Sequence, residues 1–178
     1  LAKGLLFIQR RRSREVIEAE EEASRKYGAG PGAVRFISGT YAPHIELEAT
    51  LARFHGREAA MIFSSAYAAM LGVFTPLVSE ETALVSDALN HNCIINAIKL
   101  ARPKEKRVYR HNDVAELDAR LTEVEGCKRA LVVTDGIFSM RGDHAPLDRL
   151  FEIAARHDAA FPENVVVIVD DSHGVGAY

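Results

Sequence analysis

From residue 58 onward, the sequence alternates between short apolar runs and longer segments whose apolar residues recur every three or four positions. The short runs predict strands and the longer segments predict helices, because these two periods match the two kinds of backbone. The predicted strands cover 58–63, 83–86, 107–110, 130–134 and 165–169, and the predicted helices cover 67–77, 93–101, 114–121 and 147–157. Strands separated by helices form βαβ units. The sequence therefore predicts an α/β fold, a mostly parallel sheet with helices on both faces.

Two further helices are predicted before this alternating region. Ser13 is the expected N-cap of a helix that runs to Tyr27, where Gly28 ends it. A second helix has Pro43 in its first turn and ends at Gly56. The residues of this second helix that we expect to face inward are Leu47, Leu51 and Phe54.

The glycine-rich stretch "GAGPGAVRFISGT" joins these two helices. It does not match a dinucleotide-binding fingerprint, because that motif needs a strand before it and a helix that opens within it. Here a helix precedes the stretch and Pro31 interrupts it. The stretch is expected to be either a flexible connection or a loop that faces the substrate.

Composition narrows the class of protein. The chain has 178 residues, of which 48% are hydrophobic and 26% charged, which is typical of a globular protein with its own core. A net charge of -3 argues against a general nucleic-acid-binding protein. No apolar run approaches the roughly 18 to 20 residues that cross a bilayer. Cys93 and Cys127 form no CxxC pair, so we expect no disulfide framework and a reducing, cytoplasmic location.

Polar residues follow the predicted strands at the points where the strands end. In open parallel sheets, ligands bind beyond the carboxyl ends of the strands. The residues concerned are Ser64 and Ser65, then Asp87, Asn90 and His91, then Asp135 and Ser139, and finally Asp170 and His173. Their shared position at one edge of the predicted sheet indicates a binding site more strongly than any one of these residues does.

Each of these residues also has an ordinary structural interpretation. The backbone N–H groups of 65–67 lie at a predicted helix start and are suited to a phosphate, although Ser65 is also a plain N-cap. His91 is either a ring available for stacking or a satisfied histidine. Ser139 is either a ligand-binding residue or a residue that bonds its own loop.

The run "VVVIVDDSHGVG" begins with a strand that is apolar enough to be buried on both faces of the sheet. Two acids, Asp170 and Asp171, nevertheless follow directly at its end. A buried carboxylate needs a positive partner or several donors. Pyridoxal phosphate offers an anionic phosphate, a flat ring and a pyridinium N–H that could pair with Asp170. The alternative is a two-metal hydrolase built from the spacings Asp87-x-x-x-His91 and Asp170-x-x-His173. The residues alone leave both open.

Several stretches resemble the α-oxoamine synthases, a family of pyridoxal-phosphate enzymes with the fold of aspartate aminotransferase. The matching stretches are "RFISGT", "SDALNH", "HND", "TDGIFSM" with "GDHAPL", and "VDDSHGVG", in the order of the family. The glycine C-acetyltransferase branch is the most similar, and the 8-amino-7-oxononanoate and 5-aminolevulinate branches are close to it. The resemblance implies that 29–178 is the first part of the large cofactor-binding domain and that 1–28 is a separate helical segment.

The resemblance also implies a role for each candidate residue. Ser65, Ala66 and Tyr67 would hold the phosphate, His91 would stack on the ring, Asp170 would pair with the ring nitrogen, and Ser139 and His173 would contact the phenolic oxygen. His91, Asp170 and His173 would be the catalytic residues. His44, near the "SGT" loop, would lie at the substrate entrance. Asp171 has no implied role and is expected to be structural, and no metal is expected.

The implied reaction joins glycine, or another small amino acid, to acetyl-CoA or another acyl-CoA, giving 2-amino-3-ketobutyrate and CoA. A homodimer is implied, with neither nucleic acid nor membrane as a partner. The lysine that carries the cofactor in this family follows the "DDSHGVG" stretch, and no lysine here matches it, so the chain is expected to be inactive alone. It would be either part of a longer enzyme or a lysine-free, non-catalytic partner subunit.

The beginning of the sequence departs from the family pattern. Relatives carry an asparagine-containing stretch that helps to hold the amino-acid carboxylate, whereas this sequence reads "KGLLFIQRR". This departure leaves the identity of the amino-acid substrate open.

Overall fold

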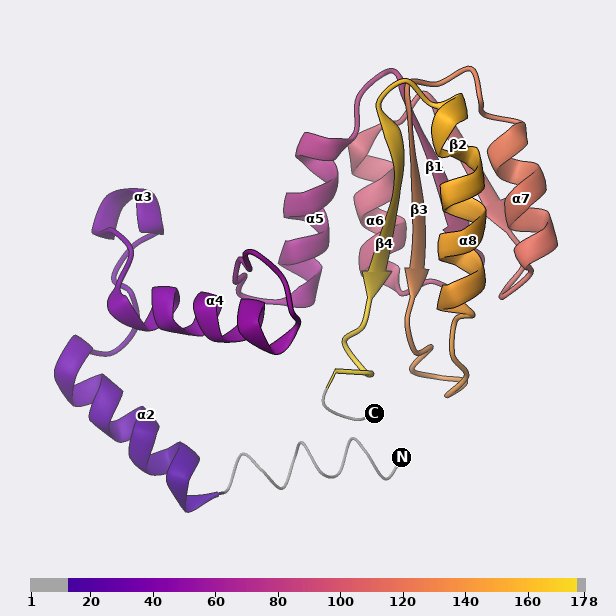
Figure 1. Ribbon diagram of the computed structural model, residues 1–178. Helices are drawn as coiled ribbons and strands as arrows, with labels where there is room; N and C mark the ends of the chain where they lie inside the picture. The colour runs from indigo at the N-terminus through magenta and orange to yellow at the C-terminus, as the bar shows by residue number, and fades with distance from the viewer. Residues whose placement is uncertain (1–12, 176–178) are drawn as a thin grey trace. The chain divides into compact units, whose positions relative to one another are not determined.

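A computed structural model describes residues 13–175 (Figure 1). The chain divides into two compact units, Leu1–Ile62 and Phe63–Tyr178, which we describe separately. The expected boundary between 1–28 and 29–178 falls inside the first unit and stays a prediction. The "KGLLFIQRR" departure lies outside the described residues.

The described part of the first unit, from residue 13, has the helices α2 (Arg14–Tyr27), α3 (Arg35–Ser38) and α4 (Ala42–Phe54). The caps predicted for α2 are confirmed, because the Ser13 side chain accepts a hydrogen bond from the Val16 N–H and Gly28 ends the helix with a φ of 90°. The glycine-rich stretch is held to α4 by Arg35, whose Nη1 lies 2.7 Å from Oε1 of Glu48.

Two expectations for the first unit are wrong. The inward orientation of Leu47 and Phe54 fails, since Phe54 is 66% exposed and Leu47 is also exposed. The strand expected at 58–63 does not form, and Met61 is 71% exposed. A strand needs a neighbouring backbone, and here the Ile62 N–H instead donates to Glu48 Oε1 at 3.2 Å.

The second unit confirms the predicted parallel sheet and its helices. Its strands are β1 (Thr82–Asp87), β2 (Glu105–Tyr109), β3 (Arg129–Asp135) and β4 (Asn164–Asp170), all parallel and in the order β2-β1-β3-β4. The helices are α5 (Ala66–Leu77), α6 (Asn92–Ala101), α7 (Val114–Thr122) and α8 (Leu147–His157), followed by the 3-10 turn η1 (Asp158–Ala160). No described helix combines the length and the apolar character that crossing a membrane would need.

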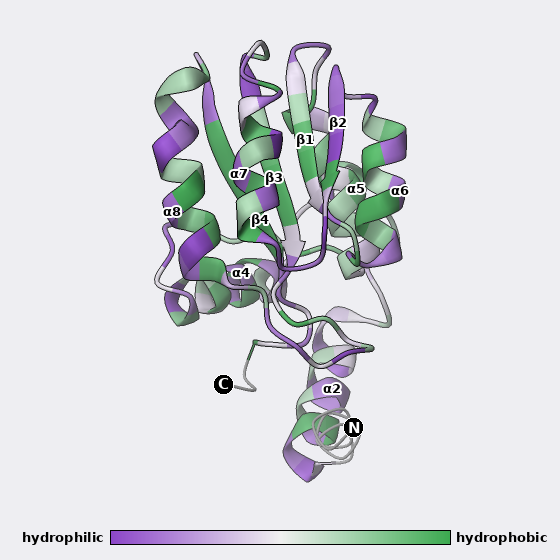
Figure 2. Ribbon diagram, turned by 90° about the vertical axis from the view of Figure 1, so that its right-hand side faces the viewer, coloured by the Kyte–Doolittle hydropathy of each residue, from purple (hydrophilic) through white to green (hydrophobic). Residues whose placement is uncertain are grey.

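Each face of the sheet has its own hydrophobic core. Leu117 of α7 and Leu150 of α8 pack with Val132 on one face, whereas Phe74 of α5 and Ile94 of α6 pack on the other. Figure 2 shows the resulting pattern, with β3 mostly hydrophobic and β2, at an edge, mostly hydrophilic. Alternate residues of the central strands therefore serve opposite cores.

Strand β4 departs from expectation in one respect. Its apolar residues 165–169 are half-buried rather than buried. The reason is its position at the edge of the described sheet, where it pairs with β3 along one side. Asp170, the last residue of β4, is nevertheless buried.

Candidate functional site

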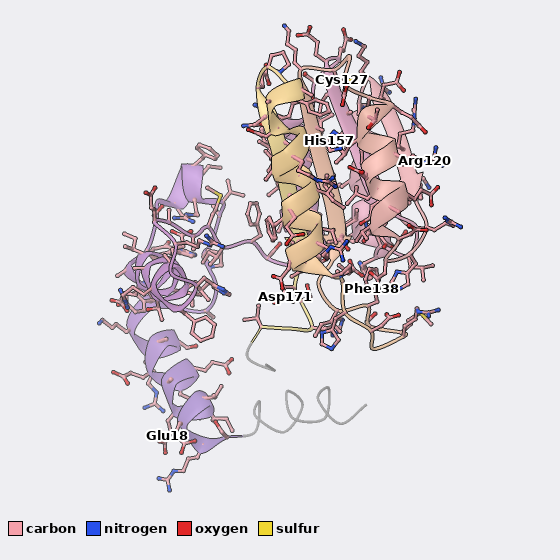
Figure 3. All side chains as sticks on the ribbon, turned by 45° about the vertical axis from the view of Figure 1, so that its right-hand side comes forward. Glu18, Arg120, Cys127, Phe138, His157 and Asp171 are labelled. Carbon is pink, nitrogen blue, oxygen red and sulfur yellow. The ribbon has the colours of Figure 1, made fainter. Side chains whose placement is uncertain are left out.

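A cavity of about 180 Å³ lies at the carboxyl ends of β1, β3 and β4. The residues that line it are Ala66, His91, Asp135, Ile137, Ser139, Asp170, Ser172 and His173. In Figure 1 the arrowheads of β3 and β4 meet at this end, and Figure 3 shows Phe138 and Asp171 near it, with Cys127 toward the opposite end. The structure thus brings the predicted residues Ala66, His91, Ser139, Asp170 and His173 around one cavity.

Three predicted residues are not part of this lining. Ser65 is the N-cap of α5, and its Oγ accepts a hydrogen bond from the Ala68 N–H at 3.1 Å. The hydroxyl of Tyr67 accepts a bond from Asn96 Nδ2 at 2.7 Å. His44 belongs to the first unit, where its Nδ1 accepts a bond from the Tyr41 N–H at 3.2 Å. Contact of these three with a cofactor or substrate stays a prediction.

The start of α5 supplies the donors for an anion. The first N–H groups of a helix have no partner within the helix, and the helix dipole favours negative charge there. Ala66, the first residue of α5, lines the cavity. The plain N-cap interpretation of Ser65 and the phosphate interpretation are therefore compatible, because Ser65 uses its side chain and leaves the backbone of Ala66 facing the cavity.

His91 has a structural role that the sequence analysis missed. It is the N-cap of α6, and its Nδ1 accepts a hydrogen bond from the Cys93 N–H at 3.2 Å. Its own N–H is directed at Asp135 Oδ1, at 3.4 Å. The bond from the Cys93 N–H fixes the ring, and His91 is exposed and lines the cavity.

Asp170 lies at the bottom of the cavity and is 8% exposed. Its Oδ1 accepts hydrogen bonds from the N–H of Ser172 at 3.1 Å and from the Ser172 hydroxyl at 2.5 Å. The thiol of Cys93 donates to Oδ2 at 3.6 Å. Within residues 13–175, neither lysine, arginine nor histidine forms an ion pair with this carboxylate. A buried anion that faces a cavity without a cation is suited to a cationic ligand.

A second acid, Asp135, lines the same cavity and received no role from the sequence. Burial raises the pKa of Asp135 to about 6, an effect that the His91 N–H opposes and the nearby Asp170 charge reinforces. The backbone N–H of Asp135 donates to Asn90 Oδ1 at 2.8 Å, and Asn90 Nδ2 donates to the Val133 carbonyl, also at 2.8 Å. Asn90 therefore ties the end of β1 to the end of β3.

The two-metal site considered from the sequence does not form. Asp87 Oδ1 accepts a hydrogen bond from the Leu89 N–H at 2.8 Å, and Asp87 Oδ2 accepts one from the Asn112 N–H at 2.9 Å. Both carboxylate oxygens therefore bond donors other than His91. Among the described residues, the group whose ligand atoms lie close enough to share a metal is His91, Cys93 and Asp170. Neither Asp87 nor His173 belongs to that group.

His111, from the "HND" stretch, joins three segments beside the site. Its Nδ1 lies 3.1 Å from Asp87 Oδ1, and its Nε2 lies 3.0 Å from Asp143 Oδ2. Carboxylates only accept, so the ring must be doubly protonated to serve both. Burial lowers the pKa of His111, but hydrogen bonds to Asp143 and then Asp87 outweigh it and raise the pKa overall. His111 thus fixes the loop that carries Ser139.

Asp171 fits the structural role expected for it. Its carboxylate occupies the space beside Gly136 and Gly174, and a Cβ on Gly136 would lie 2.5 Å from Asp171 Oδ1. A Cβ on Gly174 would collide with the same oxygen. Both glycines are therefore required by the close approach of this side chain.

No lysine lines the cavity as far as the described residues define it. The expectation that no lysine of this sequence takes the position of the cofactor-bearing lysine stays a prediction. The residues at the cavity can contact a phosphate, a flat ring and a cationic ring nitrogen, but they do not supply an amine.

Comparisons with known proteins agree with this geometry. The family model described as aminotransferase class I and II matches residues 5–178. The 8-amino-7-oxononanoate synthase of Thermosipho melanesiensis is 42% identical over 158 residues, which cover 89% of this chain and 39% of that protein. The mitochondrial 2-amino-3-ketobutyrate coenzyme A ligase of Homo sapiens is 44% identical over 162 residues, 91% of this chain and 37% of that protein.

A solved structure extends the comparison to the fold. Serine palmitoyltransferase from S. paucimobilis, described with bound PLP, superposes with a TM-score of 0.80 at 34% identity, covering 89% of this chain and 38% of that one. The chain thus spans about two fifths of the length of these relatives. The resemblance to α-oxoamine synthases and the aminotransferase-like fold are confirmed, and so is pyridoxal phosphate as the cofactor of the family.

Proposed function

The chain belongs to the aminotransferase class I and II family, and from this premise we propose that it forms the part of an α-oxoamine synthase that holds pyridoxal phosphate. The observation that carries the proposal is Asp170, a buried carboxylate that faces the cavity without a cation from the described residues. A pyridinium N–H supplies the missing positive partner. Bound pyridoxal phosphate would act as an electron sink that stabilises negative charge at the α-carbon of an amino acid.

Different residues around the cavity would hold different parts of pyridoxal phosphate. The N–H groups of Ala66 and Tyr67, at the start of α5, would bind the phosphate. The His91 ring, held by its bond from the Cys93 N–H, would stack on the pyridine ring. Ser139 and His173 also line the cavity, and they would form hydrogen bonds with the phenolic oxygen of the cofactor.

Ser172 completes the arrangement by orienting Asp170. It gives two hydrogen bonds to Oδ1, so the ring nitrogen would donate to Oδ2, which also accepts the longer bond from the Cys93 thiol. A carboxylate held in this way keeps a proton on the ring nitrogen and so maintains the ring as an electron acceptor. Asp170 therefore acts on the reaction by electrostatics rather than by moving a proton itself.

We propose glycine and acetyl-CoA as the substrates, with 2-amino-3-ketobutyrate and CoA as the products. The human and bovine 2-amino-3-ketobutyrate coenzyme A ligases, each 44% identical, support this choice. Relatives named 8-amino-7-oxononanoate synthase match at 40% to 44%, which supports pimeloyl-CoA with alanine as the second candidate. A homodimer, a cytoplasmic location and a substrate contact by His44 are proposals that rest on the family resemblance.

The experiment is an absorbance spectrum of the complete protein, purified without added cofactor and recorded before and after each amino acid is added. A visible band that changes with glycine supports the proposal. Release of free thiol from acetyl-CoA or from pimeloyl-CoA then distinguishes the two substrate pairs.

A protein that stays colourless and gains no band with added pyridoxal phosphate would contradict the proposal. That outcome would instead support the lysine-free, non-catalytic partner subunit, which has no lysine to hold the cofactor.

A further inference from the structure

Three potential metal ligands of different chemistry lie close together, and two of them, His91 and Asp170, line the cavity. The Nδ1 of His91 lies 2.9 Å from the Sγ of Cys93, and this sulfur lies 3.6 Å from Oδ2 of Asp170. All three ligand atoms lie within 4.8 Å of one another. Cys93 and Asp170 are buried, whereas His91 is exposed and lines the cavity, from which an ion could enter.

The hydrogen bonds show that these atoms can act as ligands. Nδ1 of His91 accepts from the Cys93 N–H, so in the neutral ring the proton is on Nε2, and a metal ion would take the place of that hydrogen bond at the Nδ1 lone pair. The Cys93 sulfur is the donor in its bond to Asp170 Oδ2, so the metal-free protein holds a thiol there. On metal binding, the Sγ–H bond breaks, the proton leaves to solvent, and the thiolate electron pair enters the new bond.

The distances fit a tetrahedral zinc ion. Typical zinc bonds of about 2.0 to 2.3 Å place neighbouring ligand atoms about 3.3 to 3.8 Å apart. The Cys93–Asp170 distance of 3.6 Å already lies in this range, and the His91–Cys93 distance of 2.9 Å has to open slightly. A nitrogen, sulfur and oxygen set favours Zn²⁺ or Cd²⁺ over Mg²⁺, and three protein ligands leave a fourth position for water.

We propose that the cofactor-free protein binds one Zn²⁺ ion through His91, Cys93 and Asp170, and that this ion excludes pyridoxal phosphate. The exclusion follows because His91 and Asp170 are the residues assigned to the ring and to its nitrogen. This second part rests on the proposed function, whereas metal binding itself does not. Zinc therefore controls loading of the cofactor by occupying the position of its ring.

The test uses the complete protein freed of cofactor, with Cd²⁺ as the spectroscopic probe and Zn²⁺ as its competitor. We expect a near-ultraviolet thiolate-to-metal absorption band, one equivalent of metal bound, and displacement of Cd²⁺ by Zn²⁺ but not by Mg²⁺. Cys93→Ser should abolish the band and weaken Zn²⁺ binding at least tenfold. Cys127→Ser is the matched control, since this second buried cysteine does not belong to the ligand group, and its band should be unchanged.

His91→Gln provides a second variant in case Cys93→Ser fails to fold, and it should also weaken Zn²⁺ binding. Bands of equal strength in wild type and Cys93→Ser would overturn the metal site. Simultaneous binding of Zn²⁺ and pyridoxal phosphate would overturn the exclusion. A protein that binds Zn²⁺ at Cys93 but never binds pyridoxal phosphate would retain the metal site and refute the proposed function, so the two failures are distinguishable.

Discussion

Replacing His111 with Gln tests whether a cationic ring fixes the loop beside the cavity. The change keeps a polar side chain of similar reach but removes the charge between Asp87 and Asp143. The Asp87 side chain has no exposed area, so its bond to His111 is protected from solvent. A hydrogen bond to a charged group contributes about 1.5 to 3 kcal/mol and a neutral one about 1, so we expect a loss of about 1 to 2 kcal/mol.

The pH dependence of this stability loss shows whether the His111 ring is charged. The pKa of His111 is raised in the folded protein, so its contribution is complete below the ordinary histidine pKa of about 6.5 and is lost as pH rises through the raised value. Arg141 and then His111 lower the pKa of Asp143, which keeps that carboxylate charged across this window. The cost of His111→Gln should therefore be present at about pH 6 and small at about pH 9.

The assay is urea unfolding of the complete protein at both pH values, with hydrogen exchange of 136–145 as a local readout. His157→Gln is the matched control, because Nε2 of His157 lies 2.7 Å from Asp118 and Nδ1 lies 3.4 Å from Glu125, away from the cavity. Only His111→Gln should speed exchange in the loop. An equal loss of stability at both pH values would refute the cationic ring.

Two further changes test the packing around the site. Gly174→Ala should lower the free energy of unfolding by about 1 to 3 kcal/mol because its Cβ meets the Asp171 carboxylate, whereas Gly126→Ala, with open space around it, should change stability little; urea curves measure both. Asn90→Ala removes hydrogen bonds to Ser86, Val133 and Asp135 and should lower the free energy of unfolding by about 2 to 3 kcal/mol in the same assay. A loss below about 0.5 kcal/mol, roughly that of an ordinary surface change, would contradict the role of Asn90 in joining β1 to β3.

The fold of the second unit was predictable because local patterns agree with its tertiary structure. Each of its strands and helices formed within a few residues of the predicted bounds, and Asp113 caps α7 through a bond from the Glu116 N–H. The failure at 58–63 has a physical reason, since an apolar run does not specify which backbone pairs with it. The half-buried state of β4 likewise depends on its edge position rather than on its own residues.

The site was predictable only in outline. The rule that ligands bind at the carboxyl ends of parallel strands located His91, Ser139, Asp170 and His173 around one cavity. The bonds between distant residues left no local signal. His111 reaches Asp87 across 24 positions of the sequence, and Cys93 reaches Asp170 across 77. Such contacts follow from the order of the strands, which the sequence pattern does not state.

The most direct test of the central claim is the affinity of the complete protein for pyridoxal phosphate after Asp170→Asn. Asp158→Asn is the matched control, because Asp158 bonds the Val165 N–H at the other end of β4. Loss of a charge-assisted bond worth about 1.5 to 3 kcal/mol predicts a 10- to 150-fold weaker affinity for Asp170→Asn and an unchanged affinity for Asp158→Asn. Equal affinity in wild type and Asp170→Asn would contradict the assignment of this cavity to the cofactor.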